Sequence, residues 1–298
     1  MTTEIILGIN NGFAAKYWPE PDEWARVVAK DLEVKNVQFS FDLLDPTIGK
    51  RTISKTCEQI KTAADKNNLI LHSTFTGLII YAQNHLAHPN KKFRDHAYQW
   101  YQAALSVTRS LGAEACGGHM GAMSILDYED RRRRKKIRSY IVDYVRKLTD
   151  IAKVLHLQYL LWEPMPSPRE IPHTPEESIE LLEEVNEGSP VPVYLCFDLG
   201  HCNSADFIKP GDPYVWLEKL LPWTRMIHLQ QTDGKADRHW PFIAEFNRAG
   251  IIVPDRVIEI ANASPFPNLP LFFEIGHPFD APGNVIIDNY KRSIEYWS

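Results

Sequence analysis

Residues 193–201 read Val-Tyr-Leu-Cys-Phe-Asp-Leu-Gly-His, and this stretch contains the pattern on which the fold depends. Its first five residues form a short β-prone run that is bounded by polar or turn residues, which predicts a buried strand. The run closes on Asp198, and His201 follows three positions later. Other short β-prone runs in the chain also end on a charged or imidazole side chain, such as Leu69–His72 and Leu271–Glu274.

Short β-prone runs appear eight times in the chain, and an amphipathic segment of helical length follows each of them. Strands that alternate with helices predict parallel β–α–β units, and eight units in 298 residues predict a closed barrel. The expected fold is α/β, a single (β/α)₈ TIM barrel domain over residues 1–298. The expected strands are Ile5–Ile9, Val37–Phe39, Leu69–His72, Ala115–Gly118, Tyr159–Glu163, Val193–Asp198, Met226–Leu229 and Leu271–Glu274. The expected helices are Asp22–Asp31, Thr52–Asn67, Lys91–Leu111, Asp130–Leu155, Pro175–Asn186, Tyr214–Leu221, Pro254–Ala261 and Asp288–Trp297.

An open, doubly wound sheet is the alternative architecture. Such sheets commonly bind nucleotides at a G-x-G-x-x-G or G-x-x-x-x-G-K-[ST] turn, and neither pattern follows any of the eight runs. The glycines at 117, 118 and 121 fit neither spacing and are interpreted as a tight turn after the fourth strand. The barrel is therefore the favoured interpretation.

Composition argues against several classes of protein. A net charge of −5 disfavours binding to nucleic acid or anionic lipid, and no apolar run reaches the ~18 residues of a membrane span. Four cysteines without a C-x-x-C pair predict reduced thiols rather than a disulfide framework. The first residues, MTTEIILGIN, lack the basic region of a signal peptide, so we expect a cytoplasmic protein.

One basic run departs from the acidic balance. Residues 131–136 read RRRRKK, after the acidic Asp127, Glu129 and Asp130 and before an apolar helical spacing. The preferred interpretation is a solvated face at the start of a helix, and a contact with a partner or second subunit is the alternative.

Acidic and histidine side chains gather at the ends of the later strands. In a (β/α)₈ barrel these ends meet on one face, where such barrels carry their catalytic groups. Residues up to two hundred positions apart are thus expected to converge. The side chains are His72, His119, Glu163, Asp198 with His201, His228 with Asp237 and His239 in the following loop, and Glu274.

The acids in this set predict a metal ion. Three carboxylates buried together without compensation would cost several kcal/mol per charge, and no lysine or arginine stands at a matching strand end. A divalent cation would neutralise Glu163, Asp198 and Glu274, and one of the strand-end histidines would complete a mostly oxygen ligand set. Such a set suits Mg²⁺ or Mn²⁺ and accepts Co²⁺ or Zn²⁺.

The ordered series of strand-end residues resembles the xylose-isomerase-like barrel superfamily over nearly the whole chain. That superfamily includes keto-sugar 3-epimerases, inosose dehydratases and the endonuclease IV type of DNA repair enzyme. The resemblance implies one metal held by Glu163, Asp198, His228 and Glu274. It also implies that Glu163 and Glu274 act as the catalytic acid and base on opposite faces of the substrate.

Other residues are expected to bind the substrate, a small carbohydrate. The segment HLQQTDGKADRHWPF at 228–242 looks most like sugar-phosphate isomerases and epimerases, including those of four-carbon ketose phosphates. Arg238 would replace the substrate-binding arginine that tagatose-type 3-epimerases carry nearer to this histidine. Several aromatic residues would wall the site or pack in the core, namely Phe13, Tyr17, Trp18, Phe75, Trp162 and Trp240. The expected substrate-binding residues are His72, His119, His201, Asp237, Arg238, His239 and Trp18.

The favoured function is therefore a sugar or sugar-phosphate isomerase or epimerase, and three alternatives stay open. A metal-dependent lyase, either a dehydratase or a decarboxylase, could use the same enediolate. An endonuclease IV-like phosphodiesterase could use all these positions to hold three zinc ions, but the acidic charge and the lack of basic loops disfavour it. A non-catalytic sugar-binding protein would leave the acid set without a purpose. A homo-oligomer is compatible with each of these.

Overall fold

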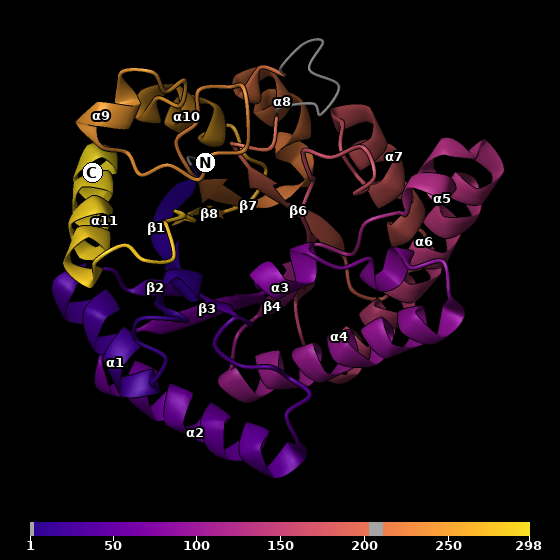
Figure 1. The fold of residues 1–298 in the computed structure, drawn as a ribbon, viewed down its shortest axis with the longest axis horizontal. Helices are drawn as coiled ribbons and strands as arrows, with labels where there is room; N and C mark the ends of the chain where they lie inside the picture. The colour runs from indigo at the N-terminus through magenta and orange to yellow at the C-terminus, as the bar shows by residue number, and fades with distance from the viewer. Residues whose placement is uncertain (1–2, 203–210) are drawn as a thin grey trace.

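Eight parallel strands close into a barrel in the computed structural model, which describes residues 3–202 and 211–298 (Figure 1). The strands follow one another around the barrel in chain order, and β1 pairs with β8 to close it. This confirms the (β/α)₈ prediction and excludes the open sheet. The strands are β1 (Glu4–Asn10), β2 (Asn36–Ser40), β3 (Ile70–Phe75), β4 (Ala115–Gly118), β5 (Tyr159–Trp162), β6 (Val193–Asp198), β7 (Thr224–Leu229) and β8 (Asn268–Phe273).

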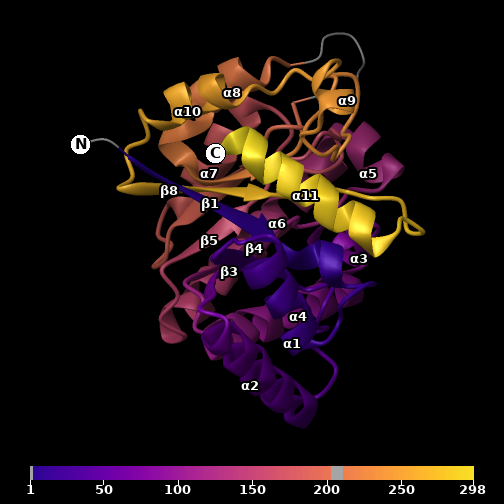
Figure 2. The same cartoon turned by 90° about the vertical axis from the view of Figure 1, so that its left-hand side faces the viewer.

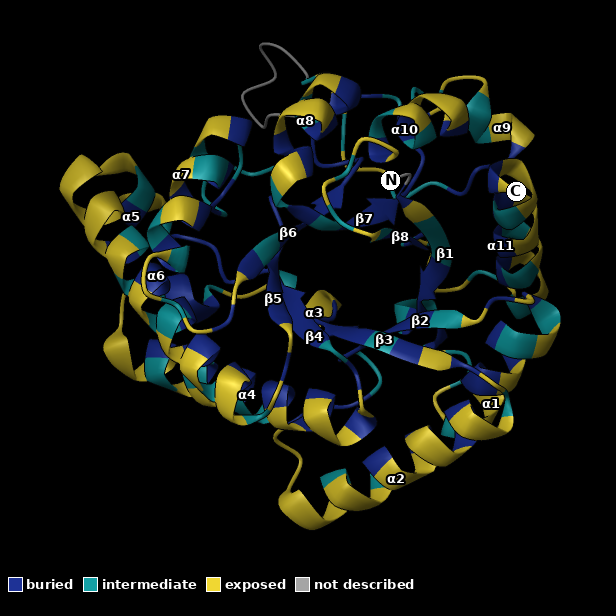
Figure 3. Ribbon diagram, turned by 180° about the vertical axis from the view of Figure 1, so that it is seen from behind, coloured by how far each residue is buried: buried dark blue, intermediate teal, exposed yellow. Residues whose placement is uncertain are grey.

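Helices surround the barrel, with buried faces turned toward the strands and exposed faces turned outward (Figure 3). In Figure 2, α11 crosses the outside of the barrel, where Trp297 packs against Phe273 of β8. A π-helical turn, Val27–Asp31, continues α1, and three 3₁₀ turns span Asn11–Ala14, His85–Ala87 and Leu221–Trp223. The helices are α1 (Pro21–Arg26), α2 (Lys50–Lys66), α3 (Leu78–Tyr81), α4 (Lys91–Leu111), α5 (Ile125–Glu129), α6 (Arg131–Val154), α7 (Pro175–Asn186), α8 (Pro213–Leu220), α9 (Ala244–Asn247), α10 (Pro254–Ala261) and α11 (Gly283–Trp297).

Local capping explains where the long helices begin and end. The Asn90 side chain accepts a hydrogen bond from the Lys92 amide at the start of α4, and Gly112 ends that helix in a left-handed conformation, φ 75°. Asp130 caps α6 by accepting from the amides of Arg132 and Arg133. The basic run at 131–136 is therefore the first, exposed part of α6, which is compatible with a solvated face and with a partner contact.

Side chains fill the interior of the barrel. Phe75, Leu161, Cys196, Met226 and Phe272 are buried there and pack together with Ala115 and Tyr159. A filled interior leaves no pore through the barrel. The polar residues described below lie where β5, β6, β7 and β8 end.

The predicted end of the third strand is wrong. β3 continues three residues beyond His72, to Phe75. His72 Nε2 lies 3.1 Å from Glu114 Oε1, and the Tyr159 hydroxyl donates to the same oxygen at 2.7 Å. Glu114 precedes β4 and Tyr159 begins β5, so His72 lies toward the amino ends of the strands, away from the strand-end acids. Within the described residues, no helix is long and apolar enough to cross a membrane.

Candidate active site

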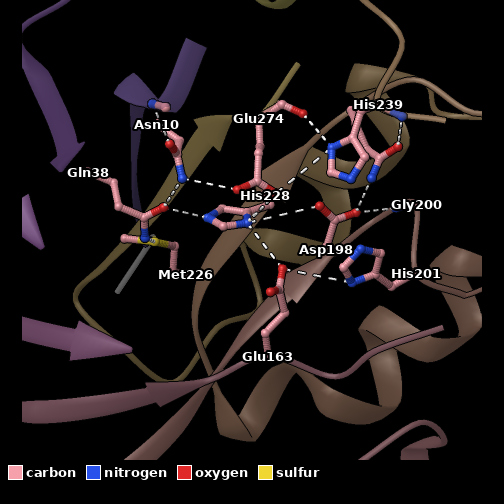
Figure 4. Close-up of polar contacts among 12 residues, drawn as sticks. Asn10, Gln38, Glu163, Asp198, Gly200, His201, Met226, His228, His239 and Glu274 are labelled. Carbon is pink, nitrogen blue, oxygen red and sulfur yellow. Dashed lines mark hydrogen bonds and ion pairs between the residues drawn. The ribbon is translucent and has the colours of Figure 1, made fainter. Parts of the chain in front are cut away.

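Four strand-end side chains converge at the carboxyl end of the barrel (Figure 4). Glu163 follows β5, Asp198 is the last residue of β6, His228 lies in β7 beside it, and Glu274 follows β8. Each offers one nitrogen or oxygen atom, and these four atoms lie within 4.8 Å of one another. The arrangement follows directly from parallel strands of matched register, since residues at the same level point into the same space.

His228 Nδ1 lies near the middle of this four-residue cluster. It is 3.1 Å from Glu274 Oε2, 3.4 Å from Glu163 Oε1 and 4.0 Å from Asp198 Oδ2. Glu163, Asp198 and His228 are fully buried, whereas the Glu274 side chain is 22% exposed. The cluster is therefore closed on the barrel side and reaches solvent beside Glu274.

The inner atoms of the cluster have no hydrogen-bond partner. Glu163 Oε1, Asp198 Oδ2 and His228 Nδ1 are all buried and unpaired. Buried polar atoms are nearly always satisfied, so three orphaned atoms that face one another require an explanation. Carboxylate oxygens and one imidazole nitrogen are the donors that a divalent cation takes, and the residues therefore fit a metal ion.

The outward atoms of the same residues are held by amides. His228 Nε2 lies 2.7 Å from Gln38 Oε1, and that oxygen also accepts from Asn10 Nδ2 at 2.9 Å. Asn10 Nδ2 donates in addition to Glu274 Oε1 at 3.0 Å. Neither amide was predicted from the sequence, because both are uncharged and their burial becomes visible only in the structure.

Asp198 is held in the same way on its outward side. Its Oδ1 accepts from the Gly200 amide at 2.6 Å and from Gln230 Nε2 at 2.9 Å. Gln230 Nε2 also donates to Asp237 Oδ1 at 2.7 Å, so one buried amide links the cluster to the loop after β7. Such outer partners fix the orientation of metal-binding side chains.

A second group of polar side chains lies beside the cluster. His201, His239 and Asp198 also bring one ligand atom each within 4.8 Å of one another. Asp237 Oδ2 lies 3.4 Å from His201 Nε2 and 3.1 Å from His239 Nε2. The Nδ1 atoms of the two histidines lie 2.9 Å from the main-chain carbonyls of Pro164 and Glu274. Both rings are therefore oriented with Nε2 toward Asp237.

The remaining predicted residues lie at different distances from this centre. His119 is fully buried, with neither ring nitrogen paired, and its ring stacks on Tyr81 at 5.2 Å between centroids. Arg238 is turned to Asp233, 3.0 Å away, and lies over the Trp240 ring. His72 lies near the other end of the barrel, as described above.

The aromatic residues expected around the substrate lie in different parts of the structure. Trp18 packs against Phe13 and Tyr17 near the start of α11. Phe75 and Trp162 are fully buried, so the core-packing interpretation holds for these two.

The carboxylates of the site favour positive charge on the histidines. Burial raises the pKa of Asp198 to about 6, and the charges of Asp237 and Glu274 act in the same direction. Burial would lower the pKa of His239, but the carboxylates of Asp237 and Asp198 raise it to about 10. Burial would also lower the pKa of His201 and of His228, but Asp198 and Asp237 raise the pKa of His201 well above its usual range, and Cys196 and Glu274 do the same for His228. A field that attracts protons to imidazoles also attracts a metal cation, which would replace them.

The chain is similar to known proteins in sequence and in fold. Residues 27–296 match the family model described as xylose isomerase-like TIM barrel. The chain is 25% identical to D-erythrulose 1-phosphate 3-epimerase of Brucella abortus (strain 2308), over 99% of this chain and 96% of that protein. A putative xylose isomerase from Rhodospirillum rubrum ATCC 11170 superposes with a TM-score of 0.91 at 30% identity, over 98% of both chains.

A more distant structure shares the fold. D-psicose 3-epimerase from Clostridium cellulolyticum H10 superposes with a TM-score of 0.68 at 15% identity, over 100% of this chain and 98% of that one. The family match spans nearly the whole chain and agrees with the closed barrel and its strand-end acids. The chain belongs to the xylose isomerase-like TIM barrel family.

Proposed function

We propose that this protein is a metal-dependent epimerase of a small keto-sugar or keto-sugar phosphate, with a tetrulose 1-phosphate as the first substrate to test. The observation that carries the proposal is the set of orphaned buried atoms Glu163 Oε1, Asp198 Oδ2 and His228 Nδ1, which face one another beside Glu274. The relative from Brucella supports the substrate class, because its name specifies a four-carbon ketose phosphate.

Glu163, Asp198, His228 and Glu274 would hold one divalent cation. Mg²⁺ or Mn²⁺ is the best match to three carboxylates and one imidazole, and Co²⁺ or Zn²⁺ would also be accepted. When bound, the cation supplies positive charge next to the carbonyl and hydroxyl oxygens of a ketose, which makes the proton on the neighbouring carbon easier to remove.

Glu163 and Glu274 would move that proton. Their strands are separated around the barrel by β6 and β7, so their carboxylates approach the cluster from different sides. One carboxylate would remove the proton and the other would return a proton to the opposite face, which inverts the carbon. Return of the proton on a single face would give isomerisation instead.

The neighbouring polar groups would orient the substrate. His201, Asp237 and His239 present nitrogen and oxygen atoms beside the cluster, where the hydroxyl or phosphate oxygens of a carbohydrate would lie. His119 has two unpaired ring nitrogens near the same place. The outer edge of the substrate site would be formed by Arg238, which lies over the Trp240 ring, and by the aromatic residues around Trp18.

The test is turnover in deuterated water. The purified protein, supplied with Mg²⁺ or Mn²⁺, is incubated with D-erythrulose 1-phosphate and with free and phosphorylated pentuloses and hexuloses. We expect an epimer that carries one deuterium at the inverted carbon, and we expect chelation to abolish its formation. Product without deuterium would point to hydride transfer. Loss of water or carbon dioxide would favour the lyase, and turnover that survives complete metal removal would contradict the proposal.

A further inference from the structure

Tyr81 contacts the cluster from an element that the sequence analysis did not foresee. It is the last residue of the four-residue helix α3, which follows β3. Its hydroxyl donates a hydrogen bond to Glu163 Oε2 at 2.5 Å. The other oxygen, Oε1, is the one that lies unpaired and faces His228 Nδ1 at 3.4 Å. The two oxygens of Glu163 are thus in different environments.

Glu274 shows the same division of roles. Its Oε1 accepts a hydrogen bond from Asn10 Nδ2 at 3.0 Å, and its Oε2 faces His228 Nδ1 at 3.1 Å. Each glutamate therefore has a neutral donor on the oxygen turned away from the centre, a phenol in one case and an amide in the other. Because the terminal torsion of a glutamate is broad, such a donor fixes the plane of the carboxylate and with it the direction of the inner oxygen.

The position of Tyr81 is fixed from two sides. The Asp42 carboxylate accepts hydrogen bonds from the amides at the start of α3, and a Cβ on Gly77 would lie 2.2 Å from Asp42 Oδ1. The close approach of this turn to Asp42 therefore requires glycine. At the other end, the Tyr81 ring stacks on His119 with 14° between the planes.

We propose that Tyr81 is a positioning residue that holds Glu163 Oε2 and thereby presents Oε1 to the metal and the reacting carbon. Without the phenol, Oε2 would be buried without a partner and the carboxylate could rotate away from its working orientation. Substrate binding would change little, because the hydrogen bond is to the enzyme's own carboxylate. The inference rests on the proposed function, because both the metal ion and the reacting carbon belong to it.

The test is Tyr81→Phe, which keeps the ring on His119 and removes only the hydroxyl. We expect Mn²⁺ affinity, measured by calorimetry without substrate, to fall ~10–100-fold, and kcat to fall within the same range while KM stays within about twofold. The control is Tyr98→Phe, because Tyr98 lies on α4 beside Tyr144 and is expected to change neither quantity.

A double-mutant cycle separates positioning through Glu163 from a general structural effect. In a Glu163→Gln background, Tyr81→Phe should change Mn²⁺ affinity by less than about twofold, since the carboxylate that it positions is gone. An equal loss in both backgrounds would overturn the proposal, and so would a rise in KM alone, which would make Tyr81 a substrate contact.

Folding is checked by thermal melting and circular dichroism. If Tyr81→Phe does not fold, 4-fluorophenylalanine at position 81 fills the space of the hydroxyl without donating a hydrogen bond, and the same Mn²⁺ loss is expected. Failure of both variants to fold would overturn the proposal in favour of a structural role. If the wild type epimerises no ketose, the proposed function fails, whereas the Mn²⁺ measurements still decide the role of Tyr81.

Discussion

Gln38 decides which nitrogen of His228 faces the cluster. Its Oε1 accepts from Asn10 Nδ2, and its Nε2 is directed to Ser73 Oγ and Met226 Sδ, so the oxygen must be the atom that lies against His228 Nε2. His228 therefore carries a proton on Nε2 and leaves Nδ1 available as a ligand.

This assignment predicts the effect of Gln38→Met. The substitution keeps a similar shape and removes the acceptor, so His228 loses its fixed tautomer, and Mn²⁺ affinity should fall ~10–100-fold by calorimetry. The exposed Gln158→Met is the matched control and should bind Mn²⁺ as the wild type does. Unchanged affinity in the folded Gln38→Met protein would show that the amide does not orient the ligand.

Replacement of either glutamate tests the proton transfer itself. Glu163→Gln and Glu274→Gln keep the size of the side chain and remove its basicity, so kcat should fall ~10²–10⁴-fold, with a further loss from weaker metal binding. Activity is measured at saturating Mn²⁺, so that the loss of the base outweighs the weaker metal binding. Glu183→Gln on the exposed face of α7 is the control. A loss below tenfold in both variants would assign the chemistry to other groups.

At the scale of single elements, strand ends were predictable wherever an apolar run closes on a charge. β6 has the bounds that the sequence predicted, and β5 differs only in ending one residue before Glu163. β3 extends beyond the predicted end at His72 through Ser73 and Thr74, which are polar and therefore outside the apolar pattern. Both are fully buried, and Thr74 satisfies its hydroxyl against Thr108 at 2.6 Å. Tertiary partners, which no local pattern contains, made these polar residues compatible with a strand.

The roles of Asn10, Gln38 and Tyr81 could not be predicted from the sequence. Amides and a phenol carry no charge that demands a neutraliser, so nothing in their spacing indicated a role. Tyr81 lies on a helix of four residues, which is too short to show a periodicity. Short elements such as α3, α5 and α9 are defined by the loops and strands around them rather than by their own sequence.

At the amino ends of β4 and β5, the partly buried Glu114 makes interactions that should stabilise the fold. Burial raises the pKa of Glu114, but hydrogen bonds from His72 and Tyr159 outweigh burial and lower it below its ordinary value of 4.5. Glu114→Gln should therefore reduce the free energy of unfolding by ~1–2 kcal/mol at neutral pH, the usual range for a hydrogen bond to a charged group.

The pH dependence of that effect has a definite sign. Because the pKa is lowered in the folded state, the stabilisation is fully present above about pH 4.5 and is lost as the pH falls through the lower, folded value. Urea unfolding of wild type and Glu114→Gln, followed from pH 7 downward, should show the two curves converging in acid. The exposed Glu187→Gln provides the control. A difference that stays constant, or grows, as the pH falls would contradict this account.

At the scale of the whole molecule, the closed barrel makes the sequence pattern informative. Eight parallel strands bring their ends to one face, so residues that the chain separates by more than a hundred positions meet at Glu163, Asp198, His228 and Glu274. The convergence of these four side chains could therefore be predicted from the strand ends. The hydrogen bonds that orient them could not, because they depend on which side chains the register places side by side.

The central claim is that this meeting point binds one divalent cation. Its most direct test is the anomalous scattering of manganese in a crystal of the full chain grown with Mn²⁺. The account predicts a single peak at ~2.0–2.6 Å from Glu163 Oε1, Asp198 Oδ2 and His228 Nδ1, with Glu274 as the fourth protein ligand. It would be contradicted by the absence of a peak among these atoms, or by three ions that include His201, Asp237 and His239 as ligands.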